Sequence, residues 1–133
     1  MQSFSVYQTK QFARFARRAR LTDGDLWQAA QRANDGLIDA DLGGGVIKQR
    51  IARSGEGKSG GSRTILLFRK RDRAVFVDGF QKKDQANLSL SDLQRYRAFA
   101  KYIFALSEAA LQESVRTGVL VEMDAPKGDE HAD

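Results

Sequence analysis

The chain contains no cysteine, a single histidine and no long apolar run. Without cysteine it can form neither a disulfide framework nor a thiolate metal site, which fits a reducing compartment. Its N-terminal segment lacks the apolar region of a secretory signal peptide, and no stretch reaches the roughly 18 apolar residues that a membrane-spanning helix needs. We therefore expect a soluble, cytoplasmic protein.

The shortage of histidine limits the chemistry further. His131 lies in an acidic C-terminal segment, which excludes a two-histidine ribonuclease mechanism. No histidine elsewhere can partner a serine or threonine in a hydrolase triad, and the carboxylates do not cluster with histidines as in a metal nuclease. We expect no metal and no cofactor, so lysine and arginine remain as the candidate chemical groups.

Positive charge concentrates in the middle of the sequence. The formal net charge is +5, and the segment 48–83 holds most of the imbalance, with Glu56, Asp72 and Asp78 as its only acids. Residues after Val121 are mainly acidic. A basic body with an acidic end suggests a polyanionic partner, although a solvated basic surface gives the same composition.

The 133 residues suit one domain, which we place at 1–121, followed by an acidic, disordered tail at 122–133. Apolar spacing predicts a strand at 4–7 and two helices, one N-capped by Thr9 and one opening with a Thr22–Asp25 capping box. Period-two patterns at 46–53, 63–70 and 74–80 predict an antiparallel meander. A capping box of Ser91 and Gln94 predicts one long helix to Thr117, followed by a short strand at 119–121.

The glycine-rich loop 54–61 does not match a nucleotide-binding loop. The Walker pattern requires a glycine at position 52, where Ala52 stands within a predicted strand, and a helix after the loop, where a strand follows. A glycine-rich loop with one lysine can still approach a phosphodiester backbone closely. The simpler interpretation is a flexible hairpin loop.

A basic cluster is the most promising chemical feature. Strand alternation places Lys48 and Arg50 on one face, roughly 7 Å apart, and Arg63 opens the next strand, where it could join them. A lysine among arginines should titrate lower than usual and could act as a general base, while arginines stabilise a phosphorane electrostatically. The alternative is that these residues are ordinary positions on the solvent-exposed face of a strand.

The stretch VIKQRIARSGEGKSGGSRTILLF, followed by VFVDGFQKKDQANLS, resembles the RelE/HigB toxin superfamily. The resemblance is strongest to the HigB-like branch, which carries a K-x-R-x-A strand, a GKxGGxR hairpin and a GF/YxK…N/D-L turn. It covers roughly residues 45 to 90, and the order of the predicted helices agrees with it.

This resemblance implies a small α+β fold, in which an N-terminal helical hairpin packs on a twisted antiparallel sheet and a long C-terminal helix follows. It also implies a toxin of a type II toxin–antitoxin system that cleaves mRNA on the ribosome without a metal. The implied partners are the ribosome, mRNA and a cognate antitoxin of the helix-turn-helix kind. DNA would be bound only through the antitoxin complex.

The resemblance also assigns roles to individual residues. Lys48 and Arg50 match the basic strand pair, Arg63 the arginine at the scissile phosphate, and Lys83 a further catalytic position. The expected RNA-binding residues are Arg53, Lys58, Arg69, Phe80 and Lys82. The chain departs from several relatives near Ser89, where they carry a tyrosine that stacks on a base. Phe80 could stack instead, or it could pack in the core.

Two other functions fit the same sequence. One is a protein of the toxin fold that binds RNA or an antitoxin without cleaving RNA, because a fold does not by itself imply an activity. The other is a basic DNA-binding module, which is less favoured because no convincing recognition helix is visible.

Overall fold

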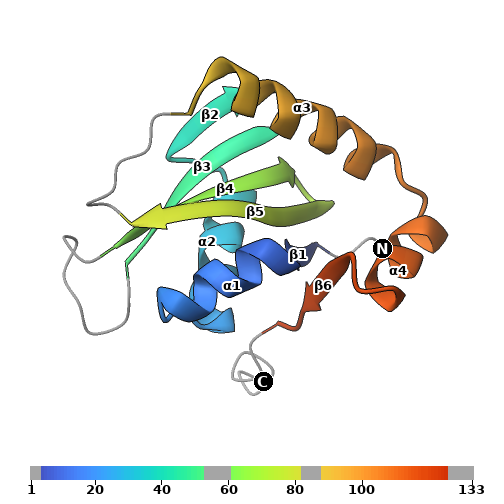
Figure 1. Cartoon of the computed structure of the whole chain (residues 1–133), viewed down its shortest axis with the longest axis horizontal. Helices are drawn as coiled ribbons and strands as arrows, with labels where there is room; N and C mark the ends of the chain where they lie inside the picture. The colour runs from blue at the N-terminus through green and yellow to red at the C-terminus, as the bar shows by residue number, and fades with distance from the viewer. Residues whose placement is uncertain (1–3, 53–60, 82–87, 126–133) are drawn as a thin grey trace.

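A twisted sheet of six strands lies at the centre of the part of the chain that the structure describes (Figure 1). The structure is a computed structural model that describes residues 4–52, 61–81 and 88–125. The sheet order is β2-β3-β4-β5-β1-β6. In chain order the strands are β1 (Ser5–Thr9), β2 (Ala40–Gly43), β3 (Val46–Ile51), β4 (Ser62–Arg69), β5 (Arg73–Gln81) and β6 (Leu120–Met123).

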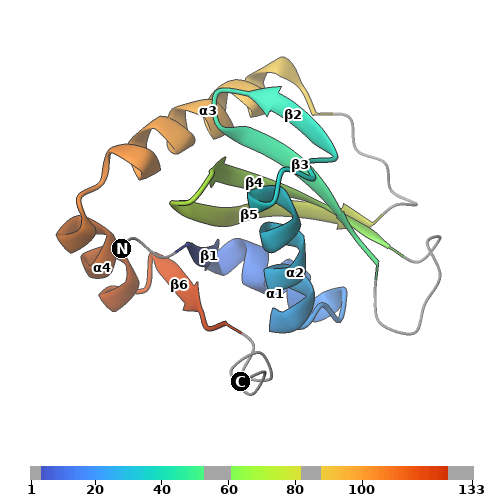
Figure 2. The same ribbon diagram turned by 180° about the vertical axis from the view of Figure 1, so that it is seen from behind.

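Helices cover both faces of this sheet (Figure 2). The helices α1 (Lys10–Arg18) and α2 (Asp23–Asn34) pack on one face, and α3 (Leu90–Ala105) and α4 (Glu108–Arg116) lie on the other side. Two buried clusters result, because neighbouring side chains of a strand point to opposite faces. In β4, for example, Leu66 joins the cluster under α1 and α2, while Ile65 and Leu67 join the cluster under α3.

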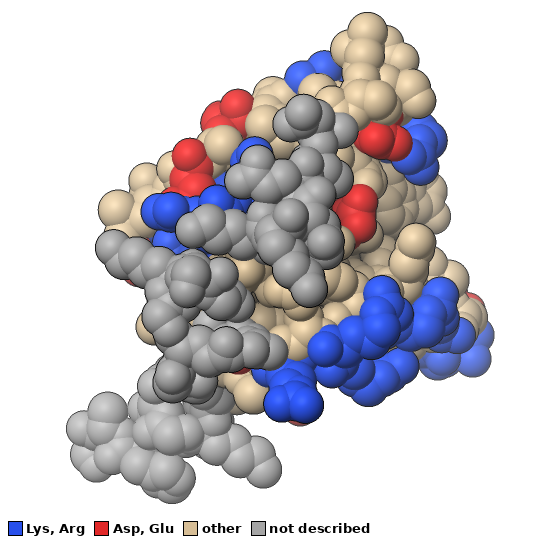
Figure 3. Space-filling view, turned by 60° about the vertical axis from the view of Figure 1, so that its left-hand side comes forward, with Lys and Arg blue, Asp and Glu red and all other residues tan. Residues whose placement is uncertain are grey.

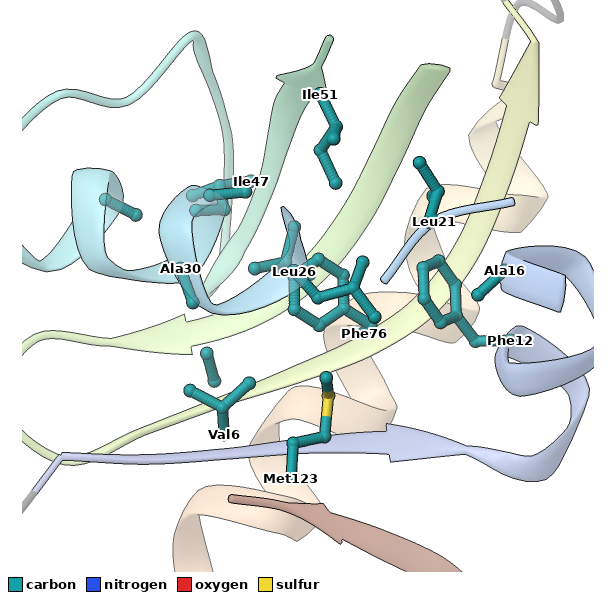
Figure 4. Close-up of a cluster of buried hydrophobic side chains, with 14 of the residues drawn as sticks. Val6, Phe12, Ala16, Leu21, Leu26, Ala30, Ile47, Ile51, Phe76 and Met123 are labelled. Atoms are coloured by element: carbon teal, nitrogen blue, oxygen red, sulfur yellow. The ribbon is translucent and has the colours of Figure 1, made fainter. Parts of the chain in front are cut away.

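Figure 4 shows the first of these clusters. Phe12 of α1 and Phe76 of β5 have ring centroids 5.1 Å apart, and Leu26 of α2 lies within the same cluster. Burying a side chain of this size contributes about 1.5–3 kcal/mol. The α+β architecture with a helical pair on one sheet face is therefore confirmed, and the predicted meander β3-β4-β5 is antiparallel as expected.

Local signals placed the first two helices correctly. The Thr9 hydroxyl accepts a hydrogen bond from the Phe12 N–H at 3.1 Å, so Thr9 is the N-cap of α1. The Thr22–Asp25 capping box is present in both directions at the start of α2. Gly36 follows the end of α2 with φ +94, a conformation that glycine adopts without steric cost.

The C-terminal helix differs from the prediction in two ways. It starts earlier, because its capping box joins Ser89 to Asp92 rather than Ser91 to Gln94. It is also two helices, because Leu106 has an extended backbone and Ser107 caps α4 by accepting from the Ala110 N–H at 3.1 Å. The single long helix to Thr117 was therefore wrong.

Several strand predictions also need correction. β1 is Ser5–Thr9 rather than 4–7 and pairs parallel to β5, while β3 ends at Ile51 rather than at 53. β2 was not predicted at all. β6 extends to Met123, which is buried, so it runs two residues past the predicted strand end.

A glycine turn joins β2 to β3 and lies against α3. Gly43, Gly44 and Gly45 all have positive φ, and a Cβ on Gly44 would come within 2.8 Å of the Arg97 side chain.

No helix among the described residues is long and apolar enough to cross a membrane.

Candidate functional site

Three residues form a row across three neighbouring strands, close to one end of each strand. Arg50 of β3 lies directly opposite Arg63 of β4, and Arg63 lies directly opposite Phe80 of β5. Directly paired residues share a sheet face, and neighbouring strands are about 4.8 Å apart, so the row spans about 10 Å. We call Arg50, Arg63 and Phe80 the arginine row.

The two arginines of this row form a close pair. The N–H and C=O of Arg50 bond to Asp39 and Arg32 on the side away from β4. Both main-chain groups of a strand residue point the same way, so Arg50 and Arg63 are a non-hydrogen-bonded pair, with Cα atoms about 4.5 Å apart. Like charges directly opposite each other destabilise a sheet. An anion bound between the two arginines would offset this repulsion, so the pair is suited to bind an anion.

Lys48 completes the cationic face. It lies two residues before Arg50 on β3, and strand alternation puts both side chains on the same side of the sheet. Lys48 and Arg63 are half-buried, whereas Arg50 is exposed. Within the described residues, none of these three side chains takes part in an ion pair. The structure therefore brings together the three residues that the sequence grouped.

One carboxylate shares this face. Asp78 of β5 pairs with Ile65, two pairs along from the arginine row and just before the bulge between Ile65 and Leu66. Asp78 accepts the Tyr96 hydroxyl of α3 and the N–H of Gly79, the latter at 2.8 Å. Burial and the bond to Asp78 raise the pKa of Tyr96 well above its usual value. Tyr96 therefore stays neutral and holds the Asp78 carboxylate in place.

Phe80 differs from the aromatic residues of the core. It is half-buried, and among the described residues it belongs to neither hydrophobic cluster. Gly79, the residue before it, faces the opposite side, where a Cβ would come within 2.4 Å of the Phe15 ring. The ring of Phe80 therefore lies on the cationic face, where a nucleobase could stack on it.

A pocket adjoins the arginine row where α2 meets the ends of β3 and β4. Gln28 and Arg32 of α2, Arg50, Arg63 and Gly61 are among the residues that line it. Two residues of the row, Arg50 and Arg63, thus border a hollow in the surface as well as the open sheet face. An extended polyanion could follow such a surface past the row.

Arg69 does not belong with the other predicted residues. It lies at the opposite end of β4 from Arg63, six residues or about 20 Å away. There it forms an ion pair with Asp72 at 3.4 Å and stacks on Phe104, 4.9 Å from the ring centroid. The structure separates it from the arginine row, and its predicted contact with RNA has no support from this position.

Four predicted residues cannot be placed. Arg53, Lys58, Lys82 and Lys83 lie outside the described residues, so their assignment as catalytic or RNA-binding groups stays a prediction. Two residues of the site were missed. Asp78 and Tyr96 are 18 positions apart and carry no shared local pattern, so only the packing of α3 on the sheet reveals their contact.

A second group of cations lies on α1, over the other sheet face. Arg14, Arg17 and Arg18 are all exposed. Figure 3 shows Lys and Arg atoms gathered along the lower right of the molecule, over α1, apart from the cations beside the grey residues. The basic surface is therefore larger than the arginine row and extends to a separate helix.

The carboxylates do not form an obvious cation site. In the ranges that the structure describes, no group of three or more His, Asp or Glu residues is placed to hold a metal ion. Asp78 is the carboxylate nearest to the arginine row in the strand pairing, and it is engaged by Tyr96 and Gly79.

The sequence matches one family of known proteins along almost its whole length. The sequence model of that family is described as RelE toxin of RelE / RelB toxin-antitoxin system, and it matches residues 4–123. The match includes every helix and strand described above. No curated protein matches the chain at a significant level.

Proposed function

Because the chain belongs to the RelE toxin family, we propose that it is a ribosome-dependent, metal-independent mRNA endoribonuclease that inhibits translation in the cytoplasm. Membership makes it a toxin of a toxin–antitoxin system with an antitoxin partner. We extend this to an antitoxin of the helix-turn-helix kind, through which the complex would bind DNA.

The arginine row carries the proposal. Arg50 and Arg63 face each other without carboxylate partners among the described residues, and Lys48 lies beside them. A fold tolerates such repulsion where a ligand of opposite charge offsets it. The RNA backbone supplies that charge, and Phe80 at the end of the row offers a stacking surface for a base.

The chemistry follows from the residue types. Lys48 would take the proton of the ribose 2′-hydroxyl, whose oxygen then attacks the adjacent phosphorus. Arg50 and Arg63 would stabilise the charge of the phosphorane. The bond to the 5′-oxygen breaks, and a protonated group returns a proton to that oxygen. Lys83 lies outside the described residues and matches a further catalytic position in the resemblance, and we propose it for this last role. The product is a 2′,3′-cyclic phosphate.

The test is cleavage of mRNA in a purified translation reaction. Cutting should persist in chelator and leave a 2′,3′-cyclic phosphate or its 3′-phosphate product. An mRNA with one 2′-deoxy sugar at the scissile position should bind and resist cutting. Efficient cutting of that substrate would rule out attack by the 2′-hydroxyl.

Variants of β3 and β4 test the site. Arg63→Ala should lower the cleavage rate by on the order of 10² or more, whereas Arg69→Ala, at the far end of β4, should change it much less. Lys48→Arg keeps the charge but replaces the proposed base by a guanidinium, which does not give up its proton in proteins, so it should retain binding and lose rate. Equal rates for Arg63→Ala and wild type would remove Arg63 from the site.

A second function, RNA or antitoxin binding without cleavage, is favoured by the position of Ser89. Several relatives carry a tyrosine there, whereas here Ser89 caps α3. In that case the chain would bind ribosomes, in a salt-dependent way, and mRNA would stay intact. Growth arrest after induction, with intact mRNA, would support this function over the first.

A further inference from the structure

The main chain of Arg50 lies at an unusual point of the sheet edge. β2 pairs with β3 only as far as Ala40, which lies opposite Lys48. Two residues further along β3, Arg50 has no strand partner on that side. Backbone groups at an exposed edge ordinarily bond to water, and the ends of strands fray.

Two side chains replace the missing strand. Asp39 accepts a hydrogen bond from the Arg50 N–H to its Oδ2 at 2.7 Å, and Arg32 of α2 donates from Nη2 to the Arg50 carbonyl oxygen at 2.6 Å. Arg32 and Asp39 also form an ion pair, with Nη1 and Oδ2 3.8 Å apart. We call these two residues the Arg32–Asp39 clamp. Both bonds involve a charged group, and such bonds are roughly twice as strong as neutral ones.

A buried amide fixes the clamp in turn. Gln49, beside Arg50, is fully buried. Its Nε2 donates to the carbonyl oxygens of Ala29 in α2 and Leu37, both at 3.1 Å, and its Oε1 accepts from the Asp39 N–H at 2.7 Å. Helix α2, the segment before β2 and strand β3 are thus joined at one point. Because buried amides need all their partners, this network is rigid.

We propose that the Arg32–Asp39 clamp positions Arg50 for RNA cleavage, and this proposal rests on the function proposed above. The clamp holds the main chain of Arg50 and leaves its side chain free for the phosphate. It also works against the repulsion between Arg50 and Arg63, which would otherwise push the end of β3 outward. Arg32 and Asp39 are positioning residues, because they act through Arg50.

A direct role of the clamp in RNA binding predicts the opposite result for Asp39. If only charge mattered, removing the Asp39 carboxylate from a cationic surface would strengthen RNA binding and maintain or raise the rate. The clamp predicts a loss, because the Arg50 N–H and Arg32 lose their acceptor. Asp39→Asn and Asp39→Ala remove the same charge, but only asparagine keeps an acceptor oxygen. Asparagine should therefore rescue part of the rate.

The experiment measures mRNA cleavage on ribosomes and the affinity of each variant for ribosomes. Asp39→Ala should lower the cleavage rate at saturation on the order of tenfold or more, as a misplaced catalytic group does, with little change in affinity. Asp39→Asn should fall between it and wild type. The control is Arg97→Ala, since Arg97 also donates to backbone carbonyls, of Leu42 and Gly43, at the other end of this hairpin. It should keep the wild-type rate.

A double variant separates positioning from other roles. In an Arg50→Ala background, assayed at raised protein concentration, Asp39→Ala should have no further effect on the rate. An undiminished effect there, or an Asp39→Ala variant as fast as wild type, would overturn the proposal.

Hydrogen exchange tests the clamp without any activity. The amide of Arg50 should exchange faster in Asp39→Ala than in wild type, while the amides of Ile65 and Leu67 in the sheet centre should stay protected and show that the fold is intact. Wild-type protection at Arg50 in the variant would refute the clamp. If exchange changes as expected but wild-type protein cleaves no mRNA, the proposed function fails and the clamp stands as a structural feature only.

Discussion

The pairing of Arg50 with Arg63 predicts that the site destabilises the fold. Replacing Arg50 by glutamine removes one charge of the pair but leaves the main-chain bonds to Asp39 and Arg32, which do not depend on the side chain. We therefore expect Arg50→Gln to raise the free energy of unfolding and to abolish most of the RNA cleavage.

The magnitude follows from the geometry. Cβ atoms of directly opposite residues are about 4.5–5.5 Å apart, and we take a separation of about 6 Å between the two guanidinium groups. At that distance two unit charges in water repel by about 0.7 kcal/mol. Screening lowers this to about 0.6 kcal/mol at 0.01 M salt, about 0.3 at 0.15 M and about 0.1 at 1 M. The gain in stability should therefore decline in that order.

Urea unfolding at these three salt concentrations measures the gain, because urea carries no charge. Arg116→Gln is the matched control, since Arg116 forms an attractive ion pair with Glu113 at the end of α4. The same substitution there should lower stability, and the loss should also shrink with salt. A gain for Arg50→Gln that does not depend on salt, or a loss at low salt, would refute the electrostatic argument.

Two further predictions concern the fold around the site. Gly79→Ala would place a Cβ within 2.4 Å of the Phe15 ring. It should lower the free energy of unfolding, measured by urea titration, by about 1–3 kcal/mol. A Phe15→Ala background should remove most of that loss. The bonds of Asp92 to Arg95 and Ser89 lower its pKa in the folded protein, so its contribution to stability is present above the unfolded pKa of about 3.9 and is lost as the pH falls through the lower folded value. Asp92→Asn should flatten the pH dependence of urea unfolding in that window, and an unchanged slope would contradict the assignment.

The elements that could be predicted have short-range causes. The residues of the Thr22–Asp25 capping box are three positions apart, and the period-two pattern of each strand spans only a few residues. Each pattern is therefore sufficient to predict its element. The break at Leu106 is different, because the apolar spacing continues through it. At the end of α3, Arg73 of β5 donates from Nη1 to the Ile103 carbonyl oxygen at 3.0 Å. No local pattern contains that contact.

The same distinction applies to the site. Lys48 and Arg50 share a face by strand alternation alone, and the hairpin pattern brought Arg63 close to them. The pairing of Arg50 with Arg63 depends on the register of the two strands. The clamp was invisible in the sequence because Arg32 and Asp39 lie on segments that only the packing of α2 brings to the edge of β3. A four-residue strand such as β2, which contains a glycine, carries too weak a pattern to be recognised.

The order of the strands in the sheet also sets an order of assembly. β1, made first, lies between β5 and β6, and its residues Ser5 and Val6 pair with Arg73 and Met123. These contacts join distant parts of the sequence and form slowly, whereas the hairpins that create the arginine row are short-range. During synthesis β3, β4 and β5 can pair before β6 has been made and can pair with β1. A partner that captures this toxin before β6 is in place would meet a protein whose site is assembled but whose sheet is still open.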